Sequence, residues 1–229
     1  MQIELVNLLW MFIPVLIVGY FYIKITLDKK TVFLAIFRMI TQLLLIGYFL
    51  VFIFDSNSSV VIFAVLFVMA FFASLISLRP LVHKEKKIYL YSFLSIMIGG
   101  LFTLGIVVFC VLKPNVWYEP KVVIPLAGMI FANSMNAISI YAKSFEDTKD
   151  MSNSFKTALI PTINSFFAVG LVSLPGMMTG QILSGVDPLI AVRYQIMVMM
   201  MILGASGMSL VVFIKLLNKK IFLTKINKI

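Results

Sequence analysis

The sequence predicts an all-α membrane protein with several spanning helices. Of its 229 residues, 62% are hydrophobic and 12% are charged, whereas a soluble domain has about 45–50% apolar and about 25% charged residues. The mean hydropathy is +1.08. Apolar runs of roughly the 20 residues needed to cross a bilayer recur along the chain. We therefore expect residues 1–229 to form a single transmembrane domain without a sizeable soluble part.

Seven apolar runs are long enough to be spanning helices, and charged or polar segments separate them. A basic turn follows the first run at 28–30, a polar turn follows the second at 55–59, and a strongly basic segment follows the third at 79–87. The seven expected spans are 5–25, 32–54, 60–78, 88–112, 122–142, 157–174 and 188–217.

The later spans carry signs of helix packing and of the membrane boundary. The fourth contains Gly99-Gly100 and Gly105, and small residues let membrane helices approach closely. Trp117 and Tyr118 then form an aromatic pair before the fifth span, as expected at a membrane–water interface. The segment 143–156 before the sixth span is the most polar part of the chain.

The positive charges predict the orientation. With seven spans and the amino terminus outside, the basic segments 24–30, 79–87, 143–156 and 215–228 all reach the inner side. Cytoplasmic loops of membrane proteins are enriched in Lys and Arg. We expect a cytoplasmic carboxyl terminus and a multi-pass protein of the bacterial cytoplasmic membrane, in contact with its lipid bilayer. The outer side receives Lys113 and Lys121 together with the acidic residues Glu4, Asp55, Glu119 and Asp187.

The composition excludes several classes of function. The net charge of +10 is explained by basic loops at one membrane face, so we expect no nucleic-acid partner. The single Cys110 and the single His83 offer no Cys or His cluster for a metal. No paired carboxylates fall within one span, and the sequence shows no nucleophile–base pair and no phosphate-binding glycine loop. We expect no enzyme activity and no cofactor on this chain, and any ATP-driven step would need a separate ATPase subunit.

One apolar stretch, Ala158–Gln195, contains many residues that interrupt helices. Breaks in a helix at membrane depth are tolerated where protein or a water-filled cavity surrounds them. We expect this stretch to line a solute pathway, with an outer gate or helix break between 175 and 187. The gate residues would be Pro175, Gly176, Gly180 and Asp187.

Polar residues inside the spans are the pathway candidates. Asn133 and Asn136 are three apart and share a helix face. They either line a polar path or join helices by hydrogen bonds. Arg38 shares a face with Gln42; it is either functional or extends to the interface. The remaining pathway candidates, from the sixth and seventh spans, are Pro161, Asn164, Arg193 and Gln195.

Two further patterns concern the seventh span. Arg193 could reach the outer interface or pair with Asp187, six residues earlier. Thioethers bind soft metals, but methionine is also a flexible packing residue, and packing is the favoured interpretation of the methionine cluster. The residues do not identify a metal ligand set. The cluster comprises Met177, Met178, Met197, Met199, Met200 and Met201.

Four sequence blocks resemble the FetB-type permeases, the membrane subunits of bacterial iron-export ABC transporters, which are related to plant aluminium-tolerance permeases. A block of the form IPxAGMIxxNSM occupies Ile124–Met135, and GLVSLPGMMTGQIL occupies Gly170–Leu183. GxDPxxAxxYQIM occupies Gly185–Met197, and an Arg-xxx-Gln-Leu element begins at Arg38. The resemblance covers nearly the whole chain. It implies a homodimeric membrane domain with two FetA-like cytoplasmic ATPase subunits, which exports a metal ion or metal complex.

One segment departs from this family's pattern. Family members carry a longer cytoplasmic segment between spans five and six, which resembles an ATPase-docking helix. Here only AKSFEDTKDMSNSFKT separates Tyr141 from Ala158, a remnant expected to form at most a short helix. It is either a reduced ATPase contact or a solvated loop. The alternative function is a diverged binding or regulatory membrane protein that has lost coupling. The contact residues would be Lys143, Glu146, Asp147 and Lys149.

Overall fold

The computed structural model is helical, as the sequence predicts. It describes residues 5–26, 31–55, 58–82 and 85–226, in which an isolated β-bridge joins Val169 and Ser173. Six of the described helices are long and apolar enough to cross a membrane. They are Val6–Thr26, Thr31–Phe54, Ser59–Ser77, Lys86–Leu112, Pro120–Thr148 and Pro188–Leu217.

The chain divides into two compact units, Met1–Asp55 and Ser56–Ile229. The first unit contains a 3₁₀ turn, η1 (Leu5–Met11), which leads into α1 (Phe12–Thr26), and then α2 (Thr31–Phe54). Neither α1 nor α2 has a buried residue. Helices that are apolar all round suit a lipid environment. The expected spans 5–25 and 32–54 correspond to these elements.

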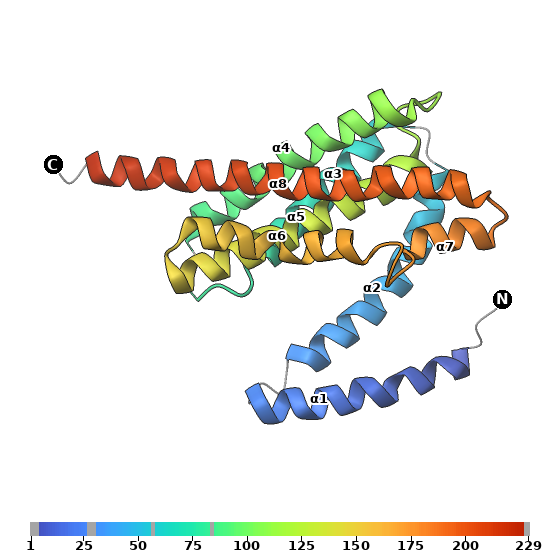
Figure 1. Ribbon diagram of the computed structural model, residues 1–229, viewed down its shortest axis with the longest axis horizontal. Coiled ribbons are helices and arrows are strands. Elements are labelled where there is room, and N and C mark those ends of the chain that lie inside the picture. Colours follow the sequence, from blue (N-terminus) through green and yellow to red (C-terminus); the bar gives the residue numbers. More distant parts are fainter. Residues whose placement is uncertain (1–4, 27–30, 56–57, 83–84, 227–229) are drawn as a thin grey trace. The chain divides into compact units, whose positions relative to one another are not determined.

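The second unit is a helix bundle (Figure 1). Its elements are α3 (Ser59–Ser77), α4 (Lys86–Gly105), the π-helix η2 (Ile106–Leu112), α5 (Pro120–Thr148), α6 (Met151–Ala168), α7 (Gly176–Leu183) and α8 (Pro188–Ile226). The long α8 packs along both α4 and α5, and α3 packs against the same two helices. The largest core side chains include Phe131, Tyr141 and Phe213.

Small residues set the contacts of α4 with α8 and α5. A Cβ atom added at Gly99 would lie 2.6 Å from the backbone nitrogen of Ser209, and one at Gly100 would lie 2.7 Å from the Phe131 ring. Both glycines therefore permit close helix packing, as predicted. The same prediction for Gly105 is wrong, because nothing lies within 4 Å of its Cβ position.

Serine hydroxyls join the helices at two buried points. Ser77 and Ser92 share a hydrogen bond of 2.7 Å between α3 and α4. Ser209 Oγ donates to Ser134 Oγ at 3.1 Å between α8 and α5. Hydrogen bonds of this kind fix the register of helices that pack in lipid, where the hydrophobic effect between helices is missing.

The polar segment 143–156 is a corner between two helices. The chain stays helical to Thr148 and again from Met151, so the expectation of a loop with at most a short helix is wrong. Lys149 takes the left-handed conformation at φ 58° and closes α5. Asp150 caps α6 by accepting the N–H of Asn153 at 3.0 Å. With these local bonds, the two residues Lys149 and Asp150 are enough to connect α5 to α6.

The expected break at 175–187 is also placed differently. The structure puts the eight-residue α7 inside this range, so Gly176 and Gly180 are helical. The irregular backbone lies earlier, at 169–175, and again at 184–187, where Gly170 and Gly185 have φ values of 81° and 90°. Glycine adopts such angles without steric cost. As a result, α6 ends at Ala168, six residues before the expected end of the sixth span.

Basic side chains of the second unit gather at one end of the bundle. The α3–α4 turn reaches the α5 end through a hydrogen bond from Val82 to Glu146, and Phe213 of α8 packs edge-to-face on Tyr141 at 6.2 Å. The part of α8 around Phe213 therefore lies beside the last turns of α5, and α8 continues past the α5–α6 corner (Figure 1). The residues brought to this end include Arg79, Lys86, Lys143, Lys149, Lys156 and Lys215.

Candidate functional site

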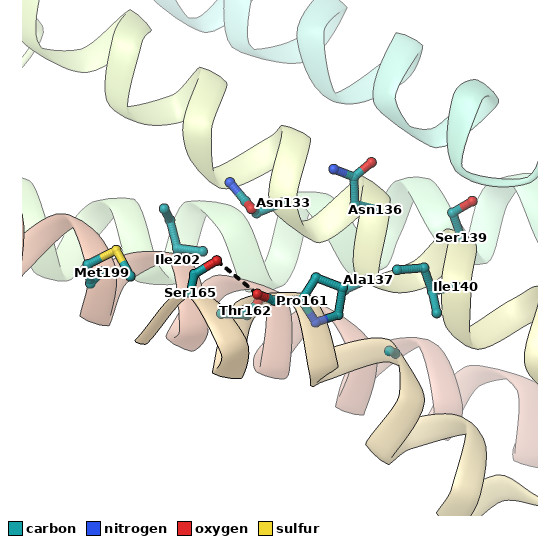
Figure 2. A pocket seen from close by; sticks show the side chains of 11 residues that line it. Asn133, Asn136, Ala137, Ser139, Ile140, Pro161, Thr162, Ser165, Met199 and Ile202 are labelled. Carbon is teal, nitrogen blue, oxygen red and sulfur yellow. Dashed lines mark hydrogen bonds between the residues drawn. The ribbon is translucent and has the colours of Figure 1, made fainter. Parts of the chain in front are cut away.

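Two neighbouring cavities lie between α5, α6, α7 and α8. The first, which we call the amide cavity, has a volume of about 320 Å³. Figure 2 shows its side chains, which come from α5, α6 and α8. It is lined by Asn133, Asn136, Ala137, Ser139, Ile140, Ala158, Pro161, Thr162, Ser165, Met199 and Ile202.

Amides and hydroxyls supply the polar lining of the amide cavity. Asn133 Nδ2 donates to the carbonyl of Met129 in its own helix at 2.8 Å. In the described part of the chain, neither the Asn133 nor the Asn136 side chain hydrogen-bonds to another helix. The joining role is taken instead by the adjacent Ser134. Of the two alternatives for these amides, the geometry favours lining a polar space.

The face of α6 that meets the cavity is built from small and polar residues. Pro161 lies within the continuous helix, and its carbonyl accepts a hydrogen bond from Ser165 Oγ at 2.8 Å (Figure 2). Proline removes one backbone donor from a helix interior. Thr162 and Ser165 were not singled out from the sequence, although their spacing of three, alongside Ala158 and Pro161, places them on one helix face.

The second cavity, the methionine cavity, has a volume of about 330 Å³ and shares Met199 with the first. Gln195 is its buried polar side chain, with 7% exposure, and its Oε1 has no hydrogen-bond partner in the structure. An unpaired buried acceptor costs about 1–3 kcal/mol, so Gln195 can accept a hydrogen bond from a solute. The lining residues are Phe166, Val169, Gly170, Leu174, Pro175, Met178, Val192, Gln195, Ile196, Met199 and Met200.

The structure therefore brings four expected pathway residues to the cavities and leaves two outside. Asn133, Asn136 and Pro161 line the first cavity, and Gln195 lines the second. Asn164 and Arg193 are exposed and line neither. Arg38 and Gln42 lie exposed on α2 in the first unit, and their place in a pathway stays a prediction.

Arg193 and Asp187 do not form the pair that their spacing suggested. Asp187 Oδ1 instead accepts the N–H of Leu189 at 2.8 Å at the start of α8. Ion pairs recorded among the described residues are those of Lys143 with Glu146 and Asp147. The Asp187–Arg193 pairing is therefore wrong in this structure, because the carboxylate is used locally as a helix cap.

Neither cavity has a charged side chain among its lining residues. The described residues contain no group of three His, Cys, Asp or Glu side chains that could hold a metal ion. Of the methionine cluster, Met178, Met199 and Met200 line the second cavity, whereas Met201 is packed in the core. The arrangement can bind a solute through amides and hydroxyls, but its lining offers no acid, base or charged nucleophile for catalysis.

The proposed ATPase-contact residues differ in exposure. Asp147 has a side-chain exposure of 55% and lies 2.7 Å from Lys143 Nζ. Lys149 is exposed at the corner. Glu146, by contrast, has 15% side-chain exposure and accepts the backbone N–H of Val82. Glu146 therefore faces the protein.

Comparison with known proteins places the chain in a family. The model of the family described as "Uncharacterised protein family (UPF0014)" matches residues 4–150 and 147–222. The chain is 31% identical to the "Probable iron export permease protein FetB" of Escherichia coli, over 87% of this chain and 84% of the relative. It is also 31% identical to "Protein ALUMINUM SENSITIVE 3" of Arabidopsis thaliana, over 81% and 75%. A UPF0014 membrane protein of Synechocystis is likewise 31% identical, over 75% of each chain.

The alignments agree with a shortened segment in this chain. The alignment with the Escherichia coli protein is 223 positions long but covers only 87% of this 229-residue chain. The alignment is therefore longer than the part of this chain that it contains, and some positions of the relative have no counterpart here. The family model breaks into its two matches at 147–150, at the α5–α6 corner. No solved structure matches the chain. The chain belongs to the UPF0014 family of multi-pass membrane proteins, which includes transport permeases.

Proposed function

We propose that the chain is the permease subunit of an ABC transporter that exports iron or another metal ion or metal complex, driven by a separate FetA-like ATPase subunit. The observation that carries this proposal is the amide cavity, a partly open pocket whose amides and hydroxyls lie between helices of a strongly apolar bundle. Polar groups in a membrane protein interior are costly and are typical of solute pathways. The substrate class is that named for the Escherichia coli relative, a probable iron export permease.

The chemistry of the cavity favours a metal that keeps its own ligands. Carboxamides and hydroxyls bind a hydration shell or an organic chelate by hydrogen bonds. The imidazole, thiolate and carboxylate ligands that hold most bare transition metals are missing from the lining, and Met199 supplies a single thioether. The solute would therefore pass as a hydrated ion or a complex. The buried amide of Gln195 would meet it in the next cavity.

The proposed arrangement has seven spans in the cytoplasmic membrane, with α6 as the span beyond the six long apolar helices. Its 18 residues would rise about 27 Å, close to the roughly 30 Å hydrocarbon core. The amino terminus would lie outside, and the basic end of the bundle would face the cytoplasm. Lys143, Asp147 and Lys149 would then meet the ATPase, and two permease copies would form a homodimer.

Export is tested by cellular iron content in cells that depend on this protein. Asn136→Ala removes an amide from the cavity, and we expect iron to accumulate as it does without the protein. Asn164→Ala is the matched control, because Asn164 is exposed like Asn136 but lies outside both cavities. Equal iron content in wild type, Asn136→Ala and Asn133→Ala cells would refute the pathway.

The shortened corner favours a second candidate, a diverged binding or regulatory protein without ATPase coupling. The two family matches meet at this corner, and two residues connect its helices. Affinity purification from membranes separates the candidates. The first expects an ATPase subunit that is recovered with wild type and lost with Asp147→Lys; the second expects none.

A further inference from the structure

Glu146 holds two separate turns of the chain together at the basic end of the bundle. Its Oε1 and Oε2 accept the N–H of Val82 at 3.1 and 3.3 Å, across 64 residues of sequence. Lys143 Nζ lies 3.5 Å from the same carboxylate. Glu146 thus links the turn between α3 and α4 to the last turn of α5.

The α3–α4 turn is a folded corner. Leu78 and Leu81 are buried within it, and Leu81 donates its N–H to the carbonyl of Leu78 at 3.3 Å. The buried Ser77–Ser92 bond holds its base. The Val82–Glu146 contact holds the other end of its described residues 78–82.

The α5–α6 corner is held by its own set of bonds. Lys149 donates its N–H to the carbonyl of Phe145 at 3.0 Å, and Asp150 donates its N–H to Thr148 Oγ1 at 3.2 Å. The Asp150 side chain caps α6. A two-residue connection with these bonds leaves little freedom between α5 and α6.

We propose that Glu146 is a positioning residue that makes these two corners one body, so that a force applied at the α5–α6 corner moves α3 and α4 together with α5 and α6. This inference rests on the proposed ATPase coupling. Because α5 carries Asn133 and Asn136 and α6 carries Thr162 and Ser165, such a body connects the basic end directly to the amide cavity. Glu146 acts through Val82 and is not itself a partner contact.

Two neighbouring acids provide a matched test. Glu146→Ala removes the acceptor for the Val82 N–H, whereas Glu146→Gln keeps one amide oxygen in its place. Asp147→Asn changes the adjacent acid, which bonds Lys143, and leaves the Val82 contact intact. Hydrogen exchange is followed at the Val82 amide of the full chain in lipid nanodiscs.

We expect Glu146→Ala to speed exchange at Val82 at least about tenfold, which corresponds to about 1.4 kcal/mol. Glu146→Gln should restore most of the protection, and Asp147→Asn should match wild type. Unchanged exchange in Glu146→Ala would overturn the proposal, because the two corners would then be held without this carboxylate.

The second readout uses the complex of this chain with the ATPase subunit recovered from membranes. In Glu146→Ala the subunit should be recovered at the wild-type level, while its Mg·ATP hydrolysis becomes independent of the permease. In Asp147→Lys recovery itself should fall. Equal loss of recovery in both variants would make Glu146 a contact residue and overturn the proposal. Recovery of no ATPase with wild type would refute the coupling function, and exchange at Val82 would still decide whether Glu146 joins the corners.

Discussion

Ser209 Oγ donates a hydrogen bond to Ser134 Oγ at 3.1 Å, in the buried contact between α8 and α5. The same residue, Ser209, faces Gly99 of α4. A single serine therefore marks the place where three helices meet. On α5, the residue directly before Ser134 is Asn133, which lines the amide cavity. The contact holds the core side of α5 while the adjacent residue faces the polar space.

Gly99→Ala should destabilise the protein. The added methyl would lie 2.5 Å from Ser209 Oγ and 2.6 Å from its backbone nitrogen, so α8 must shift, at a cost of about 1–3 kcal/mol. Thermal unfolding of the purified protein in detergent measures the change. The control is Gly105→Ala, which has nothing within 4 Å and should gain up to about 1 kcal/mol from helix propensity. Equal stability of the two variants would contradict the close packing.

Ser209→Ala and Ser206→Ala should differ although both hydroxyls are buried in α8. Loss of the Ser209 bond should cost about 0.6 kcal/mol, the average for such bonds between membrane helices. Ser206 Oγ is buried without a partner, so its removal should be neutral or stabilising. The free energy of unfolding in mixed detergent micelles is the measurement. A larger loss from Ser206→Ala would show that its hydroxyl has a partner.

Single cysteines should report whether water reaches the amide cavity. Cys110 is the native cysteine, so Cys110→Ser gives the background. Asn136→Cys places a thiol in the cavity, and Phe167→Cys places one on the outward face of α6, where Phe167 is 77% exposed. We expect a charged methanethiosulfonate to label the first at least about tenfold faster in membranes, because lipid excludes the reagent from the second. Comparable labelling rates would argue against a water-filled cavity.

Particular residues show how far the sequence leads toward the site. Asn133 and Asn136 stand out because amides are rare in an apolar run, and the structure places both at one cavity. Gln195 stands out for the same reason and is buried without a partner for its oxygen. Thr162 and Ser165 complete the lining, but small hydroxyl residues bond their own helix so often that their type alone does not distinguish a cavity from a helix surface.

Two acidic residues show where a short-range pattern leaves the surroundings of a side chain open. Arg193 and Asp187 are close in sequence, but the carboxylate caps α8. Glu146 carries a carboxylate like its neighbour Asp147, yet Glu146 faces Val82 while Asp147 faces outward. The sequence pattern around each carboxylate fits either an ion pair or exposure on the one hand, or a bond to backbone on the other. For Asp187 the backbone of α8 decides, and for Glu146 the distant Val82 decides.

The sequence by itself determined the all-α membrane class, the family and the apolar runs that form the six long helices, because apolar length, loop charge and motif spacing are properties of the chain read in order. The remaining expected span, 157–174, corresponds to the shorter α6, which ends at Ala168. Tertiary structure alone decided which polar groups share a space. The amide cavity needs α5, α6 and α8 together, and the Glu146–Val82 contact crosses 64 residues. Such contacts join residues that are far apart in the sequence, so they depend on how the helices pack and cannot be read from short sequence patterns.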